Sequence, residues 1–134
     1  MKYRFVFFIS FLAIAVVACM GKYPKADNEL AAAQYFLKAC MQGDFKRADF
    51  YMLKDSENIA DLKQLKEAYH HSNRDIRAAY DHADIIVEDN ESVNADMKII
   101  TYKNSYDNIN RKLKAVNLNG DWKIDLKYTV SGNL

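Results

Sequence analysis

The sequence is poor in the features that identify most enzymes and membrane-spanning proteins. It has no glycine-rich phosphate loop, no Cys-x-x-Cys pair, no His-Glu-x-x-His and no Gly-x-Ser-x-Gly. No apolar run reaches the roughly 20 residues that a helix needs to span a bilayer. The 19 basic and 18 acidic residues are interspersed, so the chain lacks the basic patch of a nucleic-acid-binding protein. These absences exclude the function classes that depend on such motifs.

Cysteine and proline are also scarce. The one proline, Pro24, lies in a stretch without apolar periodicity, and the two cysteines are Cys19 and Cys40. Cys40 falls on an apolar stripe with helical spacing, where a small buried hydrophobic residue is the favoured interpretation. A reactive or intermolecular thiol is the alternative in an oxidising compartment. If Cys19 is modified, no intramolecular disulfide can form.

The amino-terminal segment has the pattern of an export signal. A short positive stretch at residues 2–4 precedes apolar residues 5–17, which fits the apolar segment of about 7–15 residues in a secretory signal. The following Val16-Val17-Ala18-Cys19 resembles the lipobox of bacterial lipoproteins. The resemblance implies that Cys19 receives a diacylglyceryl group and that a peptidase cuts between Ala18 and Cys19. An ordinary cleaved signal or an uncleaved anchor is the alternative.

A lipidated terminus would hold the mature chain at a membrane of the cell envelope. Each buried methylene contributes about 0.8 kcal/mol, so two or three acyl chains bind firmly where one binds weakly. Loss of residues 1–18 leaves one domain of 116 residues with seventeen basic and eighteen acidic side chains, a net charge of −1. We expect a tether at residues 19–27 and a single domain at residues 28–134. No acidic run follows Cys19, which favours the outer membrane with the domain facing the periplasm.

Helical spacing dominates the first half of the mature chain. Asp27 or Asn28 can cap a helix that ends at Gly43, and Asp44 can cap a short second helix. A third helix is predicted from Asp55 or Ser56 to the region of Tyr69. A further helical turn is predicted through residues 76–80.

Period-two spacing dominates the second half. Strands are predicted at residues 85–87, 93–101, 113–118 and 122–128, with Asn119-Gly120 as a strong hairpin signal. Helices followed by an antiparallel meander predict an α+β domain, in which the helices pack on a curved antiparallel sheet of about four strands.

This pattern resembles the cystatin-like, nuclear-transport-factor-2-like cone fold. More narrowly, it is similar to small lipoproteins of unknown function from Bacteroides-type bacteria. The residues that carry the resemblance are 32–50, with Gly43-Asp44-Phe45 between two helices, and 119–125, with a Gly-x-Trp-Lys-Ile strand. The resemblance implies a pocket between the sheet and the first helix. It implies no catalytic residue, no cofactor and no metal.

Tyrosine is unusually frequent, with nine residues. An aromatic ring with a polar tip suits a pocket or an interface that is wet on one side, although small cores also use tyrosine at their margins. We therefore expect a non-enzymatic module that binds a small apolar or aromatic ligand, or an envelope protein. The residues expected to line its cavity are Tyr35, Tyr80, Met97, Ile99, Trp122 and Tyr128.

Two other functions stay open from the sequence. One is an acid–base enzyme of the ketosteroid-isomerase-like type, which would need Asp96, Asp125 or His82 inside the cavity. The other is a structural envelope protein whose cavity is filled by side chains. Solvated histidines are favoured over a metal site formed by His70, His82 and Asp84. Pairing of two copies through their sheets is a further expectation.

Overall fold

The structure, a computed structural model, describes residues 23–130. The helices are α1 (Glu29–Met41), α2 (Phe45–Phe50), α3 (Ser56–His71), α4 (Arg74–His82) and α5 (Leu126–Val130). The strands are β1 (Ile85–Asn94), β2 (Met97–Asn104), β3 (Arg111–Leu118) and β4 (Asp121–Asp125). Helices followed by a four-stranded antiparallel sheet confirm the predicted α+β class. The predicted lipidation and cleavage site at Ala18 and Cys19 lies outside the described residues.

Each of the first four helices begins at a side chain that caps its amino end. Asn28, Asp44, Asp55 and Asn73 each accept a hydrogen bond from the backbone N–H three residues later, at 2.8 to 3.2 Å. Such caps contribute about 1 kcal/mol each. The predicted alternatives are thereby decided, since α1 is capped by Asn28 and α3 by Asp55.

The sheet is a simple meander in the order β1-β2-β3-β4. Asn119 and Gly120 have φ of 54° and 87° and form the predicted hairpin turn between β3 and β4. Three predicted strands differ from the structure. The first extends to Asn94, the second spans Met97–Asn104 instead of residues 93–101, and the last ends at Asp125, where the chain continues as the short helix α5.

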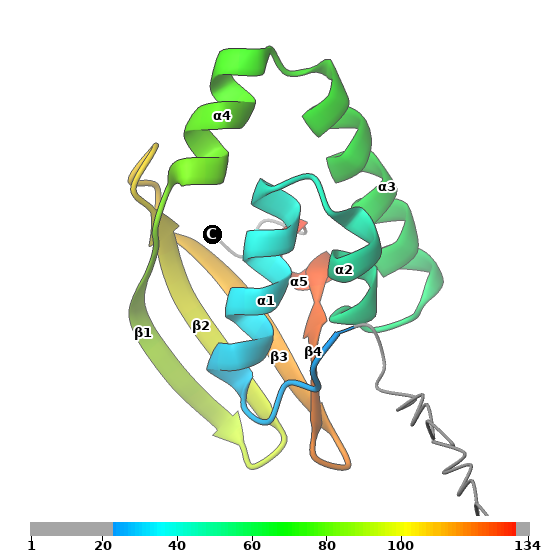
Figure 1. The fold of residues 1–134 in the computed structure, drawn as a ribbon. Helices are drawn as coiled ribbons and strands as arrows, with labels where there is room; N and C mark the ends of the chain where they lie inside the picture. The colour runs from blue at the N-terminus through cyan, green and yellow to red at the C-terminus, as the bar shows by residue number, and fades with distance from the viewer. Residues whose placement is uncertain (1–22, 131–134) are drawn as a thin grey trace, which may run out of the picture.

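The core lies between α1 and one face of the sheet. Figure 1 shows α1 across the twisted sheet, with α3 and α4 forming an arch beyond its carboxyl end. From the sheet, Ile100, Tyr102, Leu113 and Ile124 point into this core. Because side chains alternate along a strand, Ile99 lies on the opposite face of β2.

The chain joins the domain earlier than the predicted boundary at residue 28. Ala26 is fully buried, and its carbonyl oxygen accepts a hydrogen bond from the Trp122 N–H at 3.2 Å. The Tyr51 hydroxyl donates to the Pro24 carbonyl oxygen at 2.6 Å. Residues 24–26 therefore belong to the packed domain.

Candidate ligand-binding cavity

A cavity of about 400 Å³ lies between the second half of α1, the inner face of the sheet and the arch of α3 and α4. This volume is in the range of small-molecule sites. Most of its lining is apolar and comes from every layer of the fold. The apolar side chains include Phe36, Leu37, Met41, Leu65, Ile76, Leu113, Leu126 and Val130.

One wall of the cavity carries a polar cluster that is internally satisfied. The Arg111 guanidinium donates two hydrogen bonds, of 2.7 and 3.1 Å, to the Asp107 carboxylate. The Tyr80 hydroxyl donates to the same carboxylate at 3.1 Å. The hydrogen bonds from Arg111 hold the pKa of Asp107 well below its usual range. Both side chains are therefore charged, and the net charge of the pair is zero.

Tyr102 is the exception on this wall. Its side chain lines the cavity and is only 7% exposed, and its hydroxyl has no hydrogen-bond partner among residues 23–130. Burial raises its pKa to about 12, so the phenol is protonated at neutral pH. The Tyr102 hydroxyl is thus a hydrogen-bond donor in the cavity without an acceptor among the described residues.

Cys40 also lines the cavity, from the inner face of α1. Burial raises the pKa of its thiol to about 12. The thiol is therefore protonated and a poor nucleophile at neutral pH. This agrees with its position on the apolar stripe of α1 and supports a packing role.

Helix α4 covers the cavity but is loosely packed. None of its nine residues is buried, and Ile76, which lines the cavity, is 36% exposed. Tyr80 attaches the helix to the loop after β2, through Asp107 and through a ring contact with Tyr106 at 4.6 Å. The Lys38 ammonium donates to the Ala83 carbonyl oxygen at 3.1 Å. A helix held by so few contacts is a segment that can open locally.

Of the six residues expected to line the cavity, Tyr80 does so. Met97 and Ile99 lie on the other face of β2, because Ile100 and Tyr102 face the core. The adjacent pair Ile99-Ile100 fits either phase of the alternation, and the structure has the phase opposite to the predicted one.

The remaining three lie elsewhere. Tyr35 stacks on Tyr51 with ring centroids 5.0 Å apart, under the Arg47 guanidinium. Trp122 is part of the core, and Tyr128 belongs to α5. Tyr102 and Arg111 were missed as lining residues, although the inward alternation of Tyr102 with Ile100 could have identified the first.

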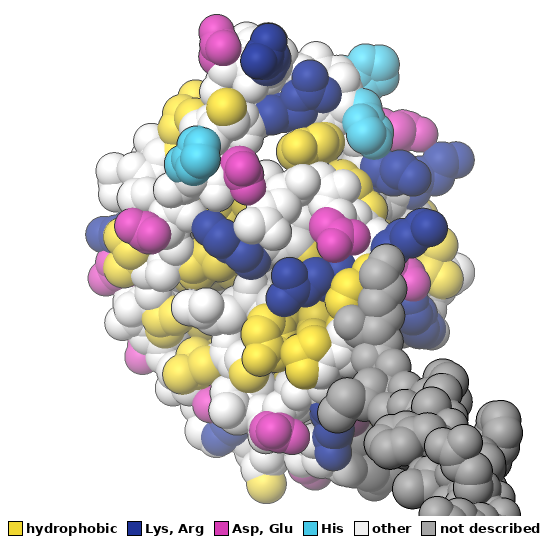
Figure 2. All heavy atoms as spheres, in the orientation of Figure 1, with side chains coloured by type: hydrophobic (Ala, Val, Ile, Leu, Met, Phe, Trp, Pro, Cys, Tyr) yellow, Lys and Arg dark blue, Asp and Glu magenta, His cyan; other side chains and the backbone are white. Residues whose placement is uncertain are grey.

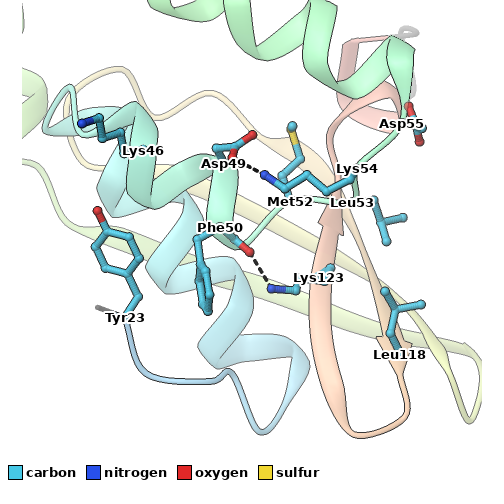
Figure 3. A pocket seen from close by; sticks show the side chains of 10 residues that line it. All are labelled: Tyr23, Lys46, Asp49, Phe50, Met52, Leu53, Lys54, Asp55, Leu118 and Lys123. Carbon is cyan, nitrogen blue, oxygen red and sulfur yellow. Dashed lines mark hydrogen bonds and ion pairs between the residues drawn. The ribbon is translucent and has the colours of Figure 1, made fainter. Parts of the chain in front are cut away.

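A second hollow lies beside the start of the described chain, and Figure 3 shows its lining. Its polar groups largely engage one another. Lys54 pairs with Asp49, and Lys123 donates to the Phe50 carbonyl oxygen while its ammonium lies 4.1 Å from the Phe50 ring. Basic and acidic side chains are interspersed on the face that carries α1 and α2 (Figure 2). This hollow therefore has a weaker claim to a ligand than the apolar cavity.

The groups considered for acid–base chemistry are not brought into the cavity. Asp125 is buried, but it accepts hydrogen bonds from Asn58 at 3.1 Å and from Lys127 at 2.6 Å, away from the cavity lining. His82 is exposed at the end of α4, and Asp96 is exposed in the turn between β1 and β2. The acid–base alternative gains no support from the described lining.

Two further features are absent from residues 23–130. In this part of the chain, no three His, Cys, Asp or Glu side chains are grouped closely enough to hold a metal ion. No helix of the same part has the length and hydropathy of a membrane span. Comparison of the chain with protein-family models, curated proteins and solved structures gives no match.

Proposed function

We propose that the chain is a lipid-anchored protein of the bacterial cell envelope that binds a small apolar ligand, without catalysis, in the cavity between α1 and the sheet. The observation that carries this proposal is the cavity of about 400 Å³, whose wall is mostly apolar and includes a satisfied ion pair and the free Tyr102 hydroxyl. A concave, mostly apolar space with few polar groups is the usual form of a small-molecule site.

The cone fold is part of the same proposal. It is supported by a long first helix that lies against a four-stranded antiparallel sheet and by a cavity that opens at the carboxyl end of that helix. Fold alone does not assign a function. The ligand proposal therefore depends on the chemistry of the lining.

Ligand binding is tested with a neutral fluorescent dye, N-phenyl-1-naphthylamine, on the Cys19→Ala chain. Ala68 on α3 lines the cavity and is itself exposed, so Ala68→Trp should place an indole in the cavity with little effect on the core. We expect the dissociation constant of the dye to rise at least about tenfold, since a blocked apolar site loses more than about 1.4 kcal/mol.

The matched control is Ala60→Trp. Ala60 is exposed on the same helix, two turns earlier, and does not line the cavity. The control should bind the dye as the parent does. If both variants bind equally well, or if the parent does not bind the dye, the cavity is not a ligand site, and docking to an envelope protein becomes the better account.

The anchor is tested by Cys19→Ala in a bacterium that processes lipoproteins. We expect the variant to lose labelling by radioactive palmitate and, as a cleaved or soluble form, to leave the membrane fraction, because it cannot accept acyl chains. Cys40→Ala is the control, since Cys40 lies on α1 within the cavity wall. Palmitate label on the Cys19→Ala protein, or loss of label from the Cys40→Ala protein, would contradict lipidation at Cys19.

The described chain begins at Tyr23, before α1, whereas the cavity lies along the second half of α1. Figure 1 shows the start of the described chain beside α2 and β4, whereas α3 and α4, which close the cavity, lie beyond the carboxyl end of α1.

A further inference from the structure

We infer that the cavity selects a neutral, mainly apolar molecule with one hydrogen-bond acceptor, to which the Tyr102 hydroxyl donates. The inference rests on the proposed function and names the class of its ligand. A long-chain ketone, ester or ether has this chemistry, whereas a fatty-acid carboxylate does not.

The first argument is that two donors left free in the lining lie on the same face of β2. The Tyr102 hydroxyl has no partner among the described residues. Asn104, two residues further along the same face of β2, is 6% exposed and also lines the cavity. Its Oδ1 accepts hydrogen bonds from the N–H groups of Tyr106 and Asp107, both at 3.0 Å, which fixes the orientation of the amide.

This orientation leaves the Asn104 Nδ2 group without a hydrogen-bond partner among residues 23–130. Two neighbouring side chains therefore offer donors to the same cavity. A ligand oxygen that accepts from either group therefore gains a hydrogen bond that a pure hydrocarbon cannot make.

The second argument is that several other polar groups of the lining are occupied. Ser72 donates to the Tyr69 carbonyl oxygen and Thr129 to that of Lys112, both at 2.6 Å. Both terminal nitrogens of Arg111 donate to the Asp107 carboxylate, and one of them also donates to the Ile109 carbonyl oxygen. A hydrogen-bond acceptor on the ligand is therefore expected to lie at Tyr102 and Asn104.

The third argument concerns charge. A carboxylate needs a cation that is not already neutralised, because burying an unpaired charge in an apolar site is costly. Arg111 is neutralised by Asp107, and the charges of the two side chains act on Tyr102 in opposite directions. Arg77, the other cation of the lining, lies over the Tyr69 ring at 5.6 Å on the α4 side. The donor end of the cavity is therefore suited to a neutral oxygen.

The experiment compares three probes with ten-carbon chains: 2-decanone, decane and decanoate at pH 8. Each displaces N-phenyl-1-naphthylamine from the Cys19→Ala chain and from the same chain carrying Tyr102→Phe. We expect 2-decanone to bind tighter than decane and decanoate, and Tyr102→Phe to weaken only 2-decanone, by about three- to tenfold for one neutral hydrogen bond. Tyr106→Phe, at an exposed tyrosine outside the lining, should change none of the three.

The outcomes separate this inference from the proposed function. If decane binds as tightly as 2-decanone, or if Tyr102→Phe weakens both equally, the donor is not used and the inference fails while the cavity remains a ligand site. Tighter binding of decanoate than of 2-decanone overturns the choice of a neutral ligand. If no probe displaces the dye and the dye itself does not bind, the proposed function fails as well. The comparison of probes on the parent chain stands even if a variant folds poorly.

Discussion

Replacing Asp125 with alanine is expected to lower the free energy of unfolding by about 1–3 kcal/mol, the cost of leaving buried hydrogen-bonding groups without their partner. The carboxylate is only 4% exposed and accepts hydrogen bonds from Asn58 at 3.1 Å and from Lys127 at 2.6 Å. Lys114 lies 3.4 Å away on the neighbouring strand. Removal of the carboxylate leaves these donors facing an empty site.

The Asp125 network joins parts of the chain that are distant in sequence. The Asn58 side chain at the start of α3 accepts from the Lys127 N–H at 2.7 Å and donates to Asp125 and Asp55. Hydrogen bonds to the two carboxylates raise the pKa of Lys127. The loss of Asp125 should therefore loosen α3 and α5 from the sheet together, and urea unfolding would measure the loss as a lower midpoint.

Asp89→Ala provides the control for Asp125→Ala. Asp89 is an exposed carboxylate on the edge strand β1, and its replacement should change the free energy of unfolding by no more than about 0.5 kcal/mol. A loss below about 1 kcal/mol for Asp125→Ala would show that the pair behaves like an exposed surface pair, which would contradict its burial.

The second large effect is expected for Gly43→Ala, in the turn between α1 and α2. Gly43 has φ of +73°, and an added Cβ would lie 2.6 Å from two ring carbons of Tyr69 and 2.7 Å from its hydroxyl oxygen. The left-handed backbone costs a non-glycine residue about 1–2 kcal/mol. Forcing a side chain into the Tyr69 ring should cost about 1–3 kcal/mol more.

Gly120→Ala separates these two costs. Gly120 also has a positive φ, of +87°, but the nearest atom to an added Cβ is the end of the Lys25 side chain at 3.6 Å. This variant should show the backbone cost alone. Equal losses in urea unfolding for the two variants would mean that Tyr69 moves aside freely. Since Tyr69 lines the cavity, Gly43→Ala should also weaken dye binding, whereas Gly120→Ala should not.

Local chemistry made much of the fold predictable. The caps at Asn28, Asp44 and Asp55 and the Asn119-Gly120 turn act over three or four residues, so they can be recognised without any knowledge of the rest of the chain. Elements fixed by distant contacts were missed. Leu126-Lys127-Tyr128 continues the alternation of β4, yet it is helical, and the Lys127 N–H bonds to Asn58 on α3.

The candidate site was less predictable than the fold for the same reason. The cavity exists because α4 and α5 close the space beside α1, and no spacing in the sequence shows where those helices pack. Whether Tyr102 points into the cavity depends in addition on which face of β2 is turned toward the core. The adjacent pair Ile99-Ile100 does not decide this in the sequence. The Asp107 carboxylate neutralises the charge of Arg111 because the loop after β2 brings the two side chains together. The sequence indicates only a turn at this loop.

The early attachment of the chain at Pro24 and Ala26 limits where a lipidated domain can go. With about 3.6 Å per residue, the four residues between a lipid on Cys19 and Tyr23 could span at most about 14 Å. That reach is close to the radius of gyration of about 13 Å expected for a domain of this size. The domain would therefore stay within one protein diameter of the bilayer and diffuse in two dimensions. It would meet ligands and partners in that thin layer, and a handover to the opposite membrane would require another carrier.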